Sequence, residues 1–97
     1  MTTRRHILVC YDIADDKRRT AVFNTLDAAG DHIQFSVFLC QLNPRERAEL
    51  LGQLLPLIHH TQDQILLIDL GPAHTPLDGG IEALGKRFEV RSRVNVV

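Results

Sequence analysis

The strongest constraint on the fold is an almost unbroken apolar run near the start of the chain. Residues 6–11 read HILVCY, are rich in β-formers, and end on Asp12. An edge strand with one wet face would alternate polar and apolar residues, whereas a continuous run is typical of a central strand that is covered on both faces. We therefore predict a central strand whose carboxyl end carries Asp12.

The residues that follow Asp12 predict a helix. Asp15 or Asp16 can cap its start, because their side chains accept hydrogen bonds from free backbone N–H groups. Apolar residues then recur at helical spacing until Gly30 closes the pattern. These residues are Val22, Phe23, Leu26 and Ala29.

A second β-rich stretch covers residues 32–42. It is too long for a typical strand of about five or six residues, so we predict two strands that divide near Ser36. A helix-start signature follows, in which Asn43 caps, Pro44 takes the first helical position and Glu46 reaches back.

The helix that begins at this signature presents one apolar face to the sheet. Its apolar residues are Leu51, Leu54, Leu55 and Ile58. Pro56 lacks the N–H that the carbonyl of Gly52 should receive, so the helix is expected to bend or end there.

A third apolar β run covers residues 64–70, and the ten residues after it, GPAHTPLDGG, contain two prolines and three glycines, as a loop does. Residues 88–96 then alternate apolar and polar, which predicts a strand with one dry face and one wet, basic face. The order βαββαβ with one additional strand predicts an α+β, ferredoxin-like domain, with an antiparallel sheet and two helices on one face.

We expect this single domain to span residues 1–97. Its C-terminal segment, residues 81–97, follows a flexible loop and is left over once the sheet is complete. The segment is therefore expected to be exchanged with, or packed on, the partner in a homodimer. The alternative is that it lies along its own sheet or frays.

The net charge of −1 gives the whole molecule no strong attraction for nucleic acid, so any such binding must come from how the charge is distributed. Basic residues do gather, notably at 17–19 and 86–93.

Cys10 and Cys40 lie in apolar runs with no secretion-type leader before them, so buried reduced thiols and a cytoplasmic location are expected. No apolar run approaches the roughly 18 residues of a membrane span.

Asp12 is the candidate catalytic residue and metal ligand. It lies where ligands bind in open α/β sheets, although an aspartate at such a turn also bonds the local backbone in many proteins. One carboxylate is a poor magnesium site, because Mg²⁺ takes octahedral coordination from one or two carboxylates, waters and phosphate oxygens. If Asp12 lies near a twofold axis, its symmetry mate supplies the second carboxylate, and one Mg²⁺ per dimer would activate water or stabilise a leaving group.

Two pairs of arginines are candidates for contacts with phosphate. Arg18 and Arg19 open the first helix on the same rim as Asp12, and Arg91 and Arg93 point the same way from the wet face of the last strand. Doubled in a dimer, these groups would follow a nucleic-acid backbone rather than distinguish bases. The alternative is that they pair locally with neighbouring acidic side chains.

Several motifs, in this order and spacing, resemble those of a known family, the small CRISPR-associated protein two, which inserts new spacers into CRISPR arrays together with a larger integrase. The motifs are VCYDI at 9–13, DKRR at 16–19, QFSVF at 34–38, LNP at 42–44 and LG at 84–85.

The resemblance implies a homodimer with swapped C-terminal strands and a divalent metal, Mg²⁺, held between two copies of Asp12. It also implies that Tyr11 lies beside the metal ligand, that Arg18 and Arg19 lie near phosphates, and that Phe38 lies near the dimer cleft.

Functions from different classes follow from this resemblance. In the first, the paired Asp12 carboxylates make the protein a magnesium-dependent endonuclease that acts on single-stranded RNA or double-stranded DNA. In the second, the same dimer is a non-catalytic scaffold that binds duplex DNA by charge and docks the integrase subunit, and Asp12 is dispensable. A ribonuclease toxin or small-ligand sensor on the same fold is a third alternative.

Overall fold

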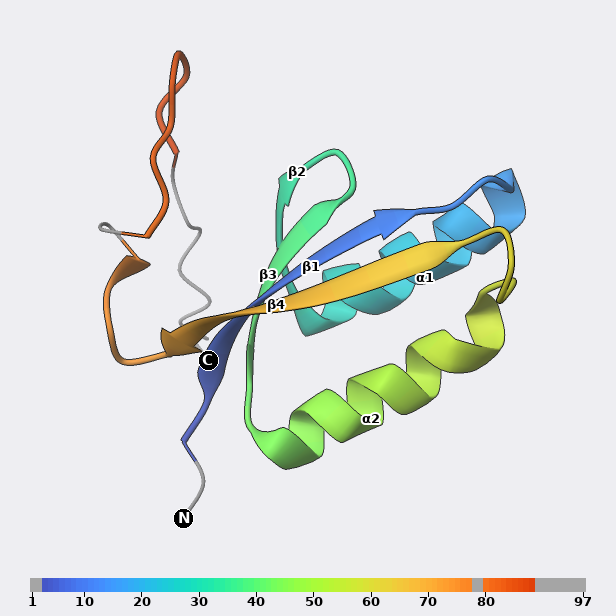
Figure 1. Ribbon diagram of the computed structural model, residues 1–97, viewed down its shortest axis with the longest axis horizontal. Helices are drawn as coiled ribbons and strands as arrows, with labels where there is room; N and C mark the ends of the chain where they lie inside the picture. The colour runs from blue at the N-terminus through green and yellow to red at the C-terminus, as the bar shows by residue number, and fades with distance from the viewer. Residues whose placement is uncertain (1–2, 78–79, 89–97) are drawn as a thin grey trace.

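The computed structural model describes residues 3–77 and 80–88. Its described elements are β1 (Arg5–Asp12), α1 (Asp16–Ala29), β2 (Gly30–Gln34), β3 (Val37–Leu42), α2 (Pro44–Leu54), the 3-10 turn η1 (Leu55–Leu57) and β4 (Gln64–Pro72). The strands form one antiparallel sheet in the order β2-β3-β1-β4 (Figure 1). The predicted ferredoxin-like α+β fold is thus confirmed, with β1 at the centre of the sheet.

The start of α1 is capped as predicted. The Asp15 side chain accepts a hydrogen bond from the backbone N–H of Arg18, and Val22 and Leu26 turn toward the core. The helix runs directly into β2 at Gly30, where the backbone of β2 lies very close to β3. A β-carbon at Gly30 would lie 2.5 Å from the sulfur of Cys40 and 2.6 Å from the carbonyl oxygen of Leu39, so only glycine fits this junction.

The second helix also begins and ends where its sequence predicts. Asn43 and Glu46 form a reciprocal capping box with Pro44 in the first turn. Arg4, immediately before β1, ties the start of that strand to this cap, because its guanidinium donates to both carboxylate oxygens of Glu46 at 2.8 Å. The α-helix ends at Leu54, and Pro56 lies in the 3-10 turn that follows.

The β-rich stretch divides as predicted. A tight turn at Phe35 and Ser36 separates β2 from β3, and the two strands pair as an antiparallel hairpin with an irregularity between His32 and Gln34. The hairpin brings the start of β3 beside the end of β1, where the Tyr11 N–H donates to the Ser36 carbonyl at 3.1 Å.

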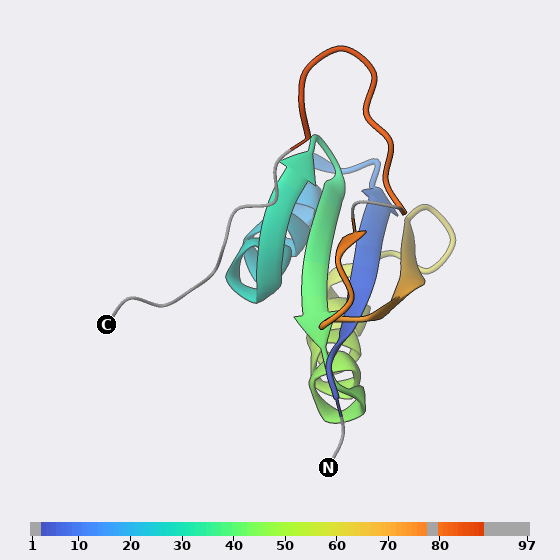
Figure 2. The same cartoon turned by 90° about the vertical axis from the view of Figure 1, so that its left-hand side faces the viewer.

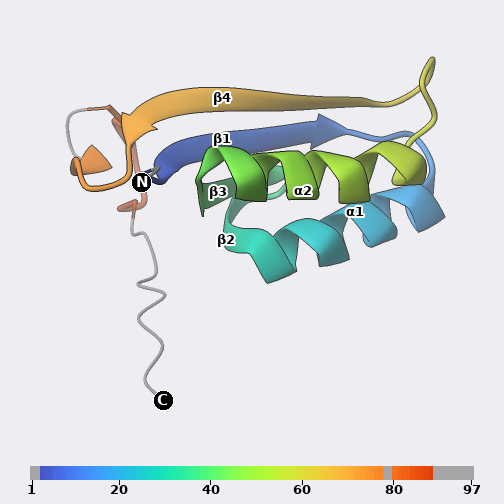
Figure 3. The same ribbon diagram turned by 90° about the horizontal axis from the view of Figure 1, so that it is seen from below.

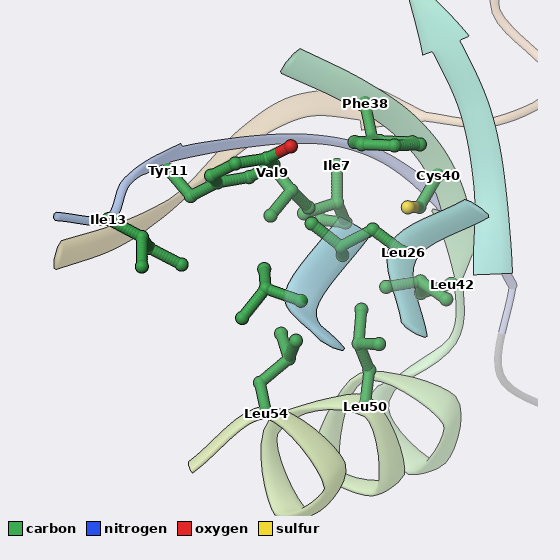
Figure 4. Packing of buried hydrophobic residues seen from close by; sticks show 11 residues of the cluster. Ile7, Val9, Tyr11, Ile13, Leu26, Phe38, Cys40, Leu42, Leu50 and Leu54 are labelled. Carbon is green, nitrogen blue, oxygen red and sulfur yellow. The ribbon is translucent and has the colours of Figure 1, made fainter. Parts of the chain in front are cut away.

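The strands form one layer and both helices cover one face of it (Figure 3). Between them lies one hydrophobic core, to which β1 contributes Ile7, Val9, Tyr11 and the following Ile13 (Figure 4). Leu26 from α1 and Leu50 and Leu54 from α2 close it from the other side.

The predicted last strand falls mainly on residues outside the described part of the chain, as do residues 89–97 of the segment that we expect to be exchanged with, or packed on, a partner. Within the described part, residues 80–88 form no strand. Neither Cys10 nor Cys40 forms a disulfide; Cys40 is buried, as predicted, whereas Cys10 is partly exposed.

Candidate metal and nucleic-acid site

Asp12 is the last residue of β1 and is exposed. Alternation along the strand places Ile7, Val9 and Tyr11 against the helices, so Asp12 belongs to the opposite face. Its cross-strand partner there is Gln64, the first residue of β4. The candidate ligand therefore lies at one end of the sheet face that carries no helix.

The helix-free side of the sheet carries a row of apolar residues, and Figure 2 shows its strands lying in front of the helices. We call this surface the open face. Residues at cross-strand positions share a face of the sheet, and the register of β1 with β3 and β4 defines the members. Its apolar members are Leu8, Cys10, Val37, Leu39, Leu66 and Ile68, and the polar His6, Gln41, Asp12 and Gln64 lie on the same face.

The described residues leave the open face incompletely covered. Leu66 is 47% exposed and Ile68 is 42% exposed, although both are large apolar residues on a strand. Beside them, a cleft of 1210 Å³ separates Leu8 and Cys10 from the irregular segment 81–88. The prediction of a strand covered on both faces thus holds for the helix side of β1 and is only half met on the open face.

Tyr11 and Phe38, which the family resemblance associates with the site, lie inside the core. Phe38 is fully buried, and the two rings stack with their centroids 6.4 Å apart. Burial raises the pKa of the Tyr11 phenol. Both side chains therefore shape the core beneath the end of β1 and present no ring to solvent.

Arg18 and Arg19 lie at the expected rim, but both guanidinium groups bind within the protein. Arg18 donates from Nε to Asp63 at 2.7 Å and from Nη2 to Gln62 at 3.2 Å. Arg19 donates from Nη1 to the carbonyl of Ile13 at 3.0 Å and pairs with Asp16. The alternative of a local acidic partner therefore holds for Arg19, whereas the acidic partner of Arg18 is Asp63, 45 positions away in the chain.

Sequence reasoning missed Asp63, whose side chain is fully buried. Its carboxylate accepts from Arg18 and from the backbone N–H groups of Ala14 and His59. The Arg18 guanidinium holds the pKa of this carboxyl well below its usual range, although burial opposes the shift. Nothing local marks the residue, because its burial depends on loops that are far apart in the sequence.

One chain offers one carboxylate at the proposed metal position. Among residues 3–77 and 80–88 there is no group of three or more His, Cys, Asp or Glu side chains that could hold a metal ion. The Asp12 carboxylate alone is therefore an incomplete ligand set for Mg²⁺, which takes one or two protein carboxylates together with water and phosphate oxygens. Arg91 and Arg93 lie outside the described residues.

Together, these features define a class of protein: a small ferredoxin-like domain with an acidic residue at the end of its first strand. The protein family described as CRISPR associated protein Cas2 matches residues 5–75, and the chain belongs to this family.

Relatives and a solved structure agree with this assignment. A Rhodospirillum rubrum protein named CRISPR-associated endoribonuclease Cas2 1 is 43% identical over 86 residues, which cover 89% of this chain and 83% of the relative. A Geobacter sulfurreducens protein named CRISPR-associated endoribonuclease Cas2 is 30% identical over 90 residues, which cover 93% and 94% of the two chains. The crystal structure of Streptococcus pyogenes Cas2 has a TM-score of 0.72 at 28% identity and covers 82% of this chain and 99% of its own.

The helices of the described part of the chain are too short or too polar to cross a membrane.

Proposed function

We propose that this protein is a homodimeric, metal-dependent endonuclease of a CRISPR system, and that Asp12 from each of two copies holds one Mg²⁺ between them. The proposal extends to a role in spacer acquisition beside the CRISPR integrase. The single observation that carries it is the position of Asp12 on the same sheet face as a row of incompletely covered apolar residues.

The apolar open face supports the dimer. Leu66 and Ile68 would be removed from water if a second copy packed there. Full burial of such a side chain contributes about 1.5–3 kcal/mol, and these two residues, still 47% and 42% exposed, would gain roughly half of that each. Because Asp12 shares this face, twofold packing through it brings the two carboxylates toward one axis. The incomplete ligand set of one chain is then completed by its partner.

Bound Mg²⁺ supplies an activated water and stabilises the charge that develops on a cleaved phosphodiester. The chain's own part is to hold Asp12 at the end of a central strand and to keep its carboxylate accessible. Lys17 is exposed on the same rim and adds positive charge for the nucleic-acid backbone. Arg91 and Arg93 would extend this contact, and Arg18 and Arg19 would reach phosphate only through N–H groups that their protein partners leave unused.

The substrate proposed first is RNA, because the relatives above are named endoribonucleases. Double-stranded DNA is the second, since charge-based contacts to a phosphate backbone do not select bases. Low aromatic content, 5% with no tryptophan, gives little surface for base stacking, which agrees with recognition of the backbone.

The test is a cleavage assay of the wild type and Asp12→Asn side by side, on single-stranded RNA and on duplex DNA, with Mg²⁺ or with a chelator. The matched control is Glu49→Gln, which makes the same change at an exposed carboxylate of α2. We expect cleavage by the wild type and the control, none by Asp12→Asn, and dimers in all three.

Equal residual cleavage by the wild type and Asp12→Asn would contradict the nuclease function. If duplex DNA then still bound to both proteins with equal affinity, the scaffold function, in which Asp12 is dispensable, would replace it.

A further inference from the structure

The side chain of Asp63 is the centre of a buried hydrogen-bond cluster. Oδ2 accepts from Arg18 Nε at 2.7 Å and from the His59 N–H at 2.8 Å. Oδ1 accepts from Arg18 Nη2 and from the Ala14 N–H, both at 3.2 Å. A buried carboxylate is costly unless it is paired and fully hydrogen-bonded, and this one meets four donors.

The donors come from segments that are far apart in the chain. Ala14 lies in the turn after β1, Arg18 lies in the first turns of α1, and His59 lies between α2 and β4. The cluster therefore joins three segments at the end of the sheet where Asp12 lies. Asp63 is also the neighbour of Gln64, the cross-strand partner of Asp12.

Each residue of the turn that follows Asp12 is fixed. The Ile13 side chain is buried, and its carbonyl accepts from Arg19 at 3.0 Å. The Ala14 N–H is held by Asp63, and the Asp15 side chain caps α1. The backbone that carries Asp12 thus has a paired strand on one side and a turn held by hydrogen bonds on the other.

We propose that Asp63 and Arg18 are positioning residues for Asp12, and that the main role of Arg18 is to fix this turn rather than to bind the phosphodiester. The inference rests on the proposed function, because Asp12 must be a metal ligand for its position to matter. Two carboxylates that share one ion across an axis tolerate little error, since a misplacement of about 1 Å lowers the rate of a positioned reaction about 100-fold.

The two roles of Arg18 predict opposite behaviour for Arg18→Lys. Lysine keeps the positive charge and can contact phosphate, but it lacks the planar fork that donates to Asp63 and Gln62 together. A phosphate-binding role is largely retained in Arg18→Lys, whereas a positioning role is lost in it. Asp63→Asn replaces one of the two accepting oxygens by an NH₂ group. In either orientation of the amide, this NH₂ group faces N–H donors and cannot accept from them.

The experiment compares the wild type, Arg18→Lys and Asp63→Asn with a control, Asp69→Asn. Asp69 forms a similar ion pair with Arg5 at 2.7 Å, but at the other end of β1. Urea unfolding and sedimentation first establish that each variant is a folded dimer. Titration with Mn²⁺ then measures metal affinity, hydrogen exchange by NMR reports on the Ala14 N–H, and kinetics on RNA separate kcat from KM.

We expect Arg18→Lys and Asp63→Asn to bind Mn²⁺ at least ~10-fold more weakly, the loss that follows when residues supporting a metal ligand are removed. Exchange at Ala14 should be faster, kcat should fall, and KM should stay near the wild-type value. Asp69→Asn should match the wild type in every readout. If Asp63→Asn fails to fold, Arg18→Lys alone decides, because it keeps the charge of the pair.

Three results would overturn the inference in distinguishable ways. Unchanged Mn²⁺ affinity and kcat in Arg18→Lys and in any folded Asp63→Asn would remove the positioning role, and an increase in KM alone would assign Arg18 to phosphate instead. If Asp12→Asn itself left Mn²⁺ affinity unchanged, the proposed metal site would fail, and the positioning role would fail with it.

Discussion

Asp12 and Gln64 are cross-strand partners at the last position where β1 and β4 pair. The same register places Cys10 opposite Leu66 and Leu8 opposite Ile68, on the same face of the sheet. The candidate metal ligand is therefore the polar end of an apolar row. If two copies associate through this row, the same contact determines where the two Asp12 carboxylates lie relative to each other.

A charge on the open face should abolish the dimer. In Leu66→Lys, packing against a second copy would bury an unpaired ammonium group, which is strongly unfavourable. We expect sedimentation equilibrium to give a monomer for this variant and a dimer for the wild type, with similar far-UV circular dichroism. The control is Leu55→Lys. Leu55 is also an exposed leucine, but it lies on η1, directly after α2, and not on the open face. A dimer in Leu66→Lys would mean that the subunits associate elsewhere.

The core position of Phe38 predicts a loss of stability when its ring is removed. The ring contacts Phe23 and His32 with centroids 5.4 Å and 4.7 Å away and is fully buried. Phe38→Ala should lower the free energy of unfolding by about 3–5 kcal/mol in urea. Phe35→Ala makes the same change at a residue that is 86% exposed and should cost no more than about 0.5 kcal/mol. Equal stability of the two variants would contradict the described core.

The Arg4–Glu46 pair predicts a specific loss of stability in acid. The hydrogen bond from Arg4, helped by the Asn43 N–H, lowers the pKa of Glu46 from 4.5 to about 2. A carboxyl whose pKa is lower in the folded state stabilises the protein above its unfolded pKa and loses this contribution as the pH falls through its folded pKa. The urea midpoint of the wild type should therefore fall between about pH 4.5 and about pH 2.

The variants Glu46→Gln and Arg4→Gln test the source of this fall. Both should show a smaller decrease in the urea midpoint over the same pH interval, because the first removes the titrating group and the second removes the main cause of its shift. Glutamine can keep the capping contact to Asn43, so Glu46→Gln should stay folded. A decrease as steep as that of the wild type in both variants would rule the pair out as its origin.

The sequence predicted features whose causes lie within a few residues. The capping box at Asn43 and the division of the hairpin near Ser36 depend on local chemistry, and both are confirmed. Strand alternation also places Asp12 on one face and Tyr11 on the other. The burial of Tyr11 follows from that alternation, although the resemblance to a family directed attention to its place beside the site.

The features that could not be predicted arise from contacts between distant segments. Arg18 and Asp63 are 45 positions apart, and they meet only because the turns at the ends of β1 and α2 converge. From the sequence, Arg18 is an exposed cation at the start of a helix and Asp63 is an acid in a loop. Their pairing changes the expected role of the arginine from a contact with substrate to support of the turn behind Asp12.

The stoichiometry of metal binding tests the shared site most directly. Isothermal titration of the purified dimer with Mn²⁺ should give one ion per two chains, and Asp12→Asn should abolish this binding while the protein remains a dimer. One ion per chain, or an undiminished ion in Asp12→Asn, would contradict a site that two copies of Asp12 complete together.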